Sequence, residues 1–247
     1  MKTKKSYLLV LNAVSYVAVL VVNILAQNGL LGSLSTKEIS DKYLNLFTPS
    51  GYVFAIWGVI YLLLGIYIVY SFVKKDKTTA LRIAPFVFMS NILNILWLLS
   101  WHFSTPFISF IVIVVLLAFL ILIVRDLKDE KVLAKTTFTV YYAWITVASI
   151  ASLFAFLVSL EGIEYNSIWM VILTNVALAI VGLLMVVKGK SENFGYILTL
   201  LWATIGIFVN QMITFEGEHL SIMIISVMVA ILGAVEFIYL LIQRKSS

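Results

Sequence analysis

Long apolar segments separated by short polar connections dominate the pattern of this chain. Eight of them approach or exceed the roughly 20 residues that a helix needs to cross about 30 Å of hydrocarbon. Their apolar character is continuous and does not alternate, which argues against the strands of an outer-membrane β-barrel. We therefore predict an all-α, polytopic membrane helical bundle with eight transmembrane helices. The predicted helices cover residues 6–27, 51–73, 83–103, 106–124, 136–160, 166–187, 194–214 and 220–242.

The composition supports a membrane protein. Hydrophobic residues make up 62% of the chain and charged residues 12%, about half the charge of a soluble domain. The mean hydropathy is +1.08. The chain has no cysteine, which excludes disulfides and thiolate metal sites. The first apolar segment follows three lysines but is too long for the core of a signal peptide, so we predict an uncleaved first helix.

The basic residues predict the orientation of the bundle. Fifteen of the 17 Lys and Arg residues fall on one side of the eight-helix arrangement, and only Lys37 and Lys42 fall on the other. Basic residues are retained on the cytoplasmic side of membrane proteins, so both termini are predicted to be cytoplasmic in a multi-pass protein of the cell membrane. The net charge of +5 then records topology and does not indicate nucleic-acid binding.

Two of the predicted helices carry aromatic and polar side chains on one face. Trp57, Tyr61 and Gly65 recur at intervals of four, and Asn94 and Trp97 share a face of the next helix. Such stripes are explained by close packing and interhelical hydrogen bonds. They are equally explained by the wall of a pocket, where indoles stack on a flat ligand and an amide orients it. The sequence leaves both interpretations open.

The fifth predicted helix adds a third stripe. Tyr141 and Trp144 lie on the face that also carries Ala148 and Ser152. Small residues at intervals of four permit close helix approach, which is the simpler explanation of this pattern. The amides Asn210 and Gln211 in the seventh helix are likewise interpreted as structural.

Glu236 is the one acidic residue inside an apolar segment. An ionisable group at that depth is costly and suggests a proton carrier or a ligand contact. It lies about two turns from the end of its segment, so a protonated carboxyl, or one that reaches a basic residue at the interface, also explains it. The two histidines, His102 and His219, are too few for a zinc site, and no catalytic motif of soluble enzymes is present.

The three stripes resemble motifs of the TspO/MBR family, the tryptophan-rich sensory proteins that include the translocator protein. The family motifs are W-x-x-L-Y-x-x-M-G, L-N-x-x-W and P-Y-x-x-W-x-x-x-A-x-x-x-N, and they occur here in family order. The matching residues are Trp57, Tyr61, Gly65, Leu93, Asn94, Trp97, Tyr141, Trp144 and Ala148. The chain departs from the motifs at Val140, where a proline is expected, and at Ser152, where an asparagine is expected.

The resemblance implies a five-helix core in residues 1–160, followed by three additional transmembrane helices in 161–247. It implies a membrane receptor that binds a flat apolar ligand, such as a porphyrin, haem or a sterol, with no cofactor required. The ligand-binding residues would be Trp57, Tyr61, Asn94, Trp97, Tyr141 and Trp144. The loop 28–50 would cover the pocket from outside.

A second hypothesis is a proton-coupled secondary transporter of a small apolar or amphipathic molecule, with Glu236 as the coupling carboxyl. An intramembrane lipid enzyme is a third, and it ranks last because no nucleophile–base pair is recognisable. The expected partners are the lipid bilayer, a small apolar ligand and a second copy of the chain in a homodimer.

Overall fold

The computed structural model describes residues 6–32, 34–103, 105–127, 132–189 and 194–245, with side chains through residue 243. Eight helices of the described part are long and apolar enough to cross a membrane, which confirms the predicted helical bundle. A short helix and a 3₁₀ turn accompany them. The elements are α1 (Tyr7–Gln27), α2 (Thr36–Lys42), η2 (Gly51–Ala55), α3 (Ile56–Val73), α4 (Thr78–His102), α5 (Pro106–Asp126), α6 (Val132–Val158), α7 (Ile168–Gly189), α8 (Phe194–Ile213) and α9 (Leu220–Lys245).

The predicted boundaries hold to within a few residues except at two helix starts. Helix α4 begins at Thr78 and not at residue 83, and α6 begins at Val132 and not at residue 136. The first turn of α4 is polar, so an apolar criterion excludes it. Asp76 Oδ1 accepts hydrogen bonds from the Thr78 amide (3.0 Å) and hydroxyl (2.7 Å), which satisfies a free donor at this helix start.

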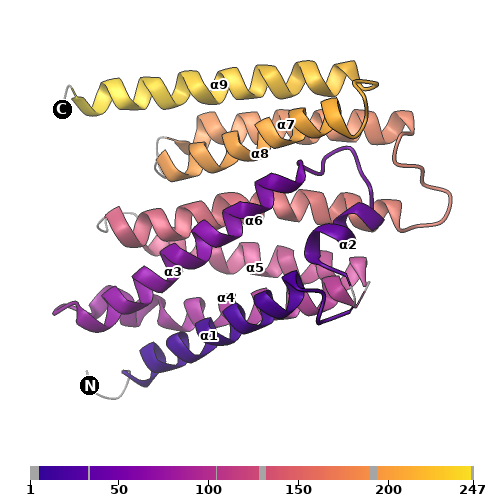
Figure 1. Cartoon of the computed structure of the whole chain (residues 1–247). Coiled ribbons are helices and arrows are strands. Elements are labelled where there is room, and N and C mark those ends of the chain that lie inside the picture. Colours follow the sequence, from indigo (N-terminus) through magenta and orange to yellow (C-terminus); the bar gives the residue numbers. More distant parts are fainter. Residues whose placement is uncertain (1–5, 33, 104, 128–131, 190–193, 246–247) are drawn as a thin grey trace.

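The helices run roughly antiparallel, and both termini lie at the same end of the bundle (Figure 1). Helices α1, α4 and α5 occupy one side, α6 lies in the middle, and α7, α8 and α9 form the other side. Helix α3 crosses the bundle at a slant, because its lead-in η2 contacts α8 while the helix itself contacts α6 and α1. The common position of the termini agrees with an even number of spans.

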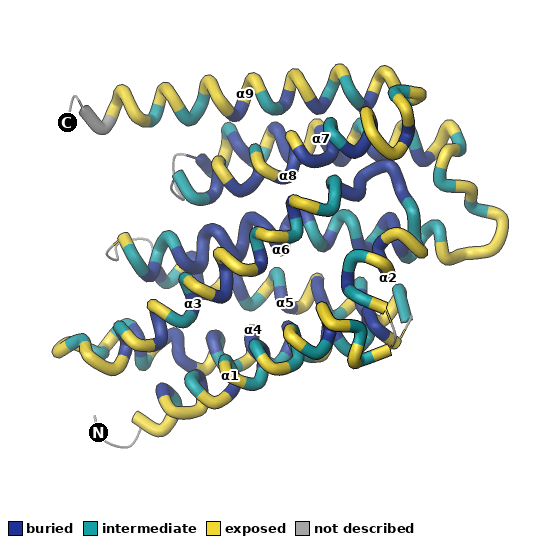
Figure 2. Tube along the Cα trace, viewed as in Figure 1, coloured by how far each residue is buried: buried dark blue, intermediate teal, exposed yellow. Residues whose placement is uncertain are grey.

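Burial is greatest in the central helix α6 (Figure 2), followed by α8 and α4. The outer faces of the helices carry exposed Val, Leu and Ile side chains, among them Val14, Leu62 and Leu183. A soluble protein does not expose so much contiguous apolar surface, whereas hydrocarbon solvates it well. The chain is therefore a multi-pass membrane protein.

The connection predicted as a polar loop over 28–50 contains α2 and a buried strip. Ser35 caps α2 by accepting a hydrogen bond from the Glu38 amide, and the Glu38 carboxylate accepts one from the Ser35 amide at 2.7 Å. This reciprocal capping box fixes the first turn of a helix. Leu46 and Phe47 are then fully buried against the bundle. We call residues 34–55, which include η2, the covering segment.

Candidate functional site

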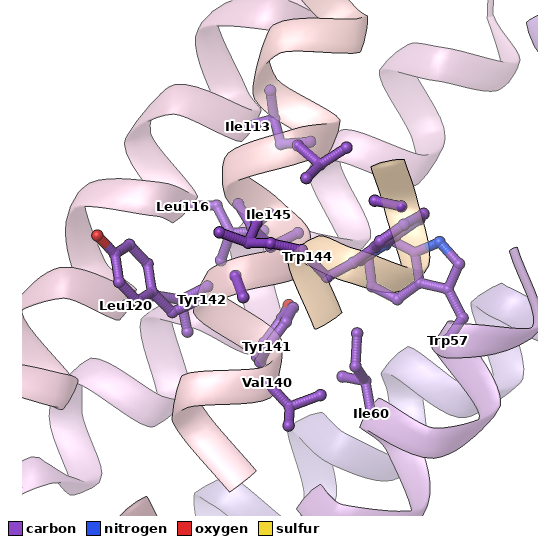
Figure 3. Close-up of a cluster of buried hydrophobic side chains, with 14 of the residues drawn as sticks. Trp57, Ile60, Ile113, Leu116, Leu120, Val140, Tyr141, Tyr142, Trp144 and Ile145 are labelled. Atoms are coloured by element: carbon purple, nitrogen blue, oxygen red, sulfur yellow. The ribbon is translucent and has the colours of Figure 1, made fainter. Parts of the chain in front are cut away.

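Trp57 is the centre of a buried group of aromatic side chains from three helices. Its ring stacks on Trp97 of α4, with centroids 5.3 Å apart, and on Tyr61, with centroids 5.5 Å apart. The rings of Tyr141 and Trp144 on α6 meet it edge-on, each with its centroid 6.2 Å away. Figure 3 shows Trp57 and these two α6 side chains directed toward one another. Five of the six predicted ligand-binding residues therefore share one cluster.

Asn94, the sixth, connects the phenols of the cluster. Its Nδ2 donates a hydrogen bond to the Tyr141 hydroxyl at 2.8 Å, and its Oδ1 accepts one from the Tyr61 hydroxyl at 3.4 Å. Asn23 of α1 donates to the same Tyr61 hydroxyl at 3.1 Å. Buried polar groups within a membrane require such partners. This network joins α1, α3, α4 and α6, and we call it together with the rings the aromatic cluster.

Gly65, the last residue of the Trp57 stripe, has a packing role. A Cβ atom at this position would lie 2.6 Å from the hydroxyl of Tyr16 on α1. That hydroxyl donates a hydrogen bond to the Tyr61 carbonyl at 2.8 Å. Because Gly65 has no side chain, the phenol of Tyr16 on α1 can reach the backbone of α3.

A cavity of about 40 Å³ lies between the aromatic cluster and the covering segment. Its walls include Trp57, Trp97 and Trp144 from the cluster and Thr36 from the cover. Ala148, Ala151 and Ser152 of α6 also line it, so the small residues of that stripe face a void. Tyr61, Asn94 and Tyr141 are not among the lining residues, because they form the layer beyond the indoles.

Three polar groups at this cavity have no hydrogen-bond partner among the described residues. They are the indole N–H of Trp97, the indole N–H of Trp144 and the hydroxyl of Thr36. All three atoms are buried, and burying a polar group without a partner costs about 1–3 kcal/mol. A buried polar group without a partner is uncommon in native structures and calls for an explanation.

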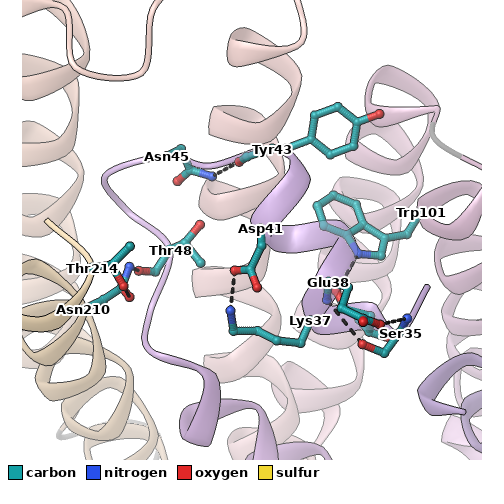
Figure 4. Close-up of polar contacts among 11 residues, drawn as sticks. Ser35, Lys37, Glu38, Asp41, Tyr43, Asn45, Thr48, Trp101, Asn210 and Thr214 are labelled. Atoms are coloured by element: carbon teal, nitrogen blue, oxygen red, sulfur yellow. Dashed lines mark hydrogen bonds and ion pairs between the residues drawn. The ribbon is translucent and has the colours of Figure 1, made fainter. Parts of the chain in front are cut away.

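The covering segment contacts α4 and α6 beside the cavity. The indole N–H of Trp101 donates to the Thr36 carbonyl at 3.3 Å, and Tyr43 packs against the same indole with ring centroids 6.1 Å apart. Phe47 stacks on Phe154 of α6 with centroids 5.6 Å apart. Figure 4 shows Trp101 beside α2, together with the capping box of Ser35 and Glu38 and the Lys37–Asp41 ion pair.

Helix α8 holds the other end of the cover, including η2. Four hydrogen bonds connect α8 to this end of the covering segment, and α8 side chains donate three of them. They are Asn210 Nδ2 to the Thr48 carbonyl (2.9 Å), Gln211 Nε2 to the Leu46 carbonyl (2.8 Å), Trp202 Nε1 to the Val53 carbonyl (3.1 Å) and the Ser50 amide to the Gly206 carbonyl (2.9 Å). Figure 4 includes the first of these. The α8 residues were not among the predicted site residues, although two adjacent amides in an apolar segment were a readable signal.

Glu236 lies apart from the aromatic cluster. It is half-buried on α9, and a Cβ atom at Gly189 of α7 would lie 3.5 Å from its Cγ. Its Oε1 is buried and has no hydrogen-bond partner among the described residues. The structure therefore places the predicted carboxyl between α9 and α7 and does not bring it to the predicted pocket. Within the described ranges, no three His, Asp or Glu side chains gather into a candidate metal site.

A family model described as TSPO-like protein matches residues 9–241 of the chain. The match covers the aromatic cluster and the covering segment, and it also spans α7, α8 and most of α9. Comparisons with curated proteins and with solved structures gave no match. The resemblance found in the three sequence motifs is thereby confirmed. The chain belongs to the TSPO-like protein family.

Proposed function

We propose that this protein is a membrane receptor that binds a flat apolar ligand of the porphyrin, haem or sterol class against the indoles of Trp57, Trp97 and Trp144. Aromatic faces provide apolar contact at low entropic cost. An acceptor group at the edge of the ligand would receive the N–H groups of Trp97 and Trp144. Tyr61, Asn94 and Tyr141 hold the rings in place from behind.

The observation that carries this proposal is the pair of unpartnered indole N–H groups at the cavity. Interhelical packing alone explains stacked rings, since such rings are common in bundle cores. It does not explain why three residues of the cavity wall each bury a polar atom without a hydrogen-bond partner. A ligand with an acceptor atom would satisfy them and recover the cost of their burial.

The cavity itself limits how binding occurs. Its volume of about 40 Å³ has room for a few water molecules, whereas sites for ligands of this class enclose about 300–1,000 Å³. The covering segment must therefore move away from α4 and α6 for a ligand to enter. Its contacts there include two ring pairs, one long hydrogen bond and the packing of Ile39 with Trp101 and Ala155, while its end toward α8 is held by four hydrogen bonds. We expect the α2 end to open and the α8 end to remain fixed.

A titration with protoporphyrin IX, followed by tryptophan fluorescence, tests the proposal. Wild-type protein in detergent micelles should show saturable quenching. Trp97→Phe retains a ring but removes the N–H, and it should weaken binding about five- to tenfold, as the loss of one buried hydrogen bond predicts. Trp97→Ala should weaken it further, because the stacking surface is lost.

Trp169→Phe is the matched control, since Trp169 lies on α7 with 71% of its surface exposed. It should lower the total fluorescence and leave the dissociation constant unchanged. Quenching that never saturates, or equal affinities for all three variants and the wild type, would refute the assignment of the ligand site to the aromatic cluster.

Transport coupled to Glu236 is a second candidate, favoured by the unpartnered Oε1 of that carboxyl. It predicts uptake driven by a proton gradient in proteoliposomes, abolished by Glu236→Gln. A receptor without coupled transport predicts ligand binding that Glu236→Gln leaves unchanged and no gradient-driven uptake.

A further inference from the structure

A second and larger hollow lies on the opposite face of α3 from the aromatic cluster. It is a groove of about 890 Å³ between α3, α6 and α8. Ile56, Val59 and Leu63 line it from α3, whereas Trp57 and Tyr61 on the same helix face the cluster. The groove is therefore independent of the proposed receptor site.

The path of α3 explains the groove. Its lead-in η2 is fixed to α8 by two contacts of the Trp202 indole. The indole N–H donates a hydrogen bond to the Val53 carbonyl, and the ring meets Tyr52 edge-on with centroids 5.2 Å apart. From there α3 slants away from α8 toward α1 (Figure 1). Two helices that are joined at one end and diverge leave a wedge between them, and α6 forms its floor.

The dimensions of the groove match one leaflet of a bilayer. Its lining on α8 runs from Phe194 to Trp202, and its lining on α6 runs from Val132 to Val140. At 1.5 Å per residue, each stretch is about 12 Å long. One leaflet contributes about half of the 30 Å hydrocarbon thickness. The groove thus starts at the end of the bundle that holds the termini and closes at Trp202, near the middle of the membrane.

The open end of the groove carries a basic side chain. Lys135 is the one charged side chain among the described lining residues, and it lies one turn from the start of α6. A lysine at this depth extends its ammonium group to the interface while its methylenes cover apolar surface. Helices α6 and α8 also begin at this end of the groove, and the dipoles of their N-terminal turns add positive potential. The rest of the described lining is apolar or hydroxylic.

From this geometry we infer that the groove is a specific binding site for an anionic phospholipid of the leaflet on the side of the termini. One acyl chain lies along the groove between α3 and α8, and the phosphate of the head group pairs with Lys135. An anionic head group matches the lysine at this end of the groove.

Native mass spectrometry of the purified chain with added phosphatidylglycerol or phosphatidylcholine of equal chain length tests the site. The wild type should retain phosphatidylglycerol preferentially. Lys135→Gln should reduce that preference about fivefold, the factor expected for one lysine near an anionic surface. Lys75→Gln removes the same charge from the exposed connection after α3, outside the groove, and should leave the preference unchanged.

Filling the groove provides the second arm. Val59 is 48% exposed and lines the groove, whereas Leu62 on the same helix is 64% exposed and does not. Val59→Trp should abolish retention of phosphatidylglycerol, and Leu62→Trp should not. Equal retention by these two variants, or an unchanged preference in Lys135→Gln, would overturn the inference.

A third measurement locates the lipid without altering the charge. The chain has no cysteine, so a single cysteine at Leu198 in the groove or at Leu183 on the lipid-facing side of α7 can carry a fluorophore. Brominated phosphatidylglycerol, diluted into phosphatidylcholine, should quench the groove label at lower mole fraction than the α7 label. Identical quenching curves would show that only ordinary boundary lipid is present and would refute the site.

Discussion

Gly206 of α8 lies where the helix touches the end of the covering segment, and Gly206→Ala is the most direct test of that contact. A methyl group at this position would lie 2.2 Å from Cγ2 of Val53 and 3.2 Å from Cβ of Pro49. Non-bonded carbon atoms prefer a separation of about 3.5–4.0 Å. The 2.2 Å contact is shorter than this preferred separation by more than about 1 Å. The backbone around Val53 or the axis of α8 must therefore shift by about that distance.

The cost of this shift follows from two terms. Overpacking a close contact costs about 1–3 kcal/mol. Movement of Val53 also weakens the hydrogen bond between its carbonyl and the Trp202 indole, which contributes on the order of 1 kcal/mol. Alanine regains about 0.5–1 kcal/mol because it is the better helix former. The expected net loss is about 2 kcal/mol of stability, with the damage centred on residues 46–53.

Thermal unfolding in detergent and hydrogen exchange resolved by peptide are the appropriate assays. Gly58→Ala is the matched control, because a methyl group on Gly58 meets no atom within 4 Å. We expect Gly58→Ala to be neutral or slightly stabilising, and Gly206→Ala to unfold at lower temperature with faster exchange in the covering segment. If the two variants unfold alike and exchange alike, the close contact between α8 and the cover does not exist as described.

Three further predictions concern single contacts. Asn94→Ala leaves the buried Tyr141 hydroxyl without its hydrogen-bond donor. The variant should therefore lose about 1–3 kcal/mol of stability, measured by unfolding in detergent. A loss indistinguishable from zero would mean that the hydrogen-bond network is not formed. Gly65→Ala should displace the phenol of α1 from the α3 backbone, which disulfide or spin-label distances between the two helices would detect as a separation absent from the wild type. The Glu38 carboxyl accepts hydrogen bonds from the amide and hydroxyl of Ser35, and these bonds lower its pKa. The capping box therefore stabilises α2 at pH values above the unfolded-state pKa. This stabilisation is lost as the pH falls through the lower pKa of the folded state. In a ¹³C titration, Ser35→Ala should raise the midpoint of Glu38, and an unchanged midpoint would contradict the capping box.

The sequence predicted those parts of the structure that depend on continuous or periodic patterns. Eight apolar segments define eight helices, since hydrocarbon admits few other structures. Three stripes at intervals of three or four residues predicted that Trp57, Trp97 and Trp144 lie on inward faces, and the structure brings them together. Helix α2 was missed because its surroundings read as a polar loop. The spacing of Ser35 and Glu38 was nevertheless a visible capping-box signal.

The remaining features depend on pairs of residues far apart in the chain. Trp202 and Val53, whose carbonyl it binds, are 149 positions apart in the chain. Gln211 and Leu46, joined in the same way, are 165 positions apart. No periodicity connects such positions, so the attachment of the cover to α8 could not be predicted. The same applies to Gly65, which was interpreted from its own helix although its partner Tyr16 lies on α1. The small volume of the cavity likewise depends on side-chain packing across five elements.

The hydrogen bonds from α8 to the carbonyls of Leu46, Thr48 and Val53 bear on whether the chain can be divided. A polypeptide truncated after α6 would leave these three carbonyl oxygens facing lipid or detergent without donors, and each such group is costly in an apolar solvent. The lid over the indoles would then refold or detach. Helix α8 is in this sense a clamp for a lid encoded more than a hundred residues earlier, and attempts to produce a minimal five-span version should yield protein that aggregates or lacks a closed cavity.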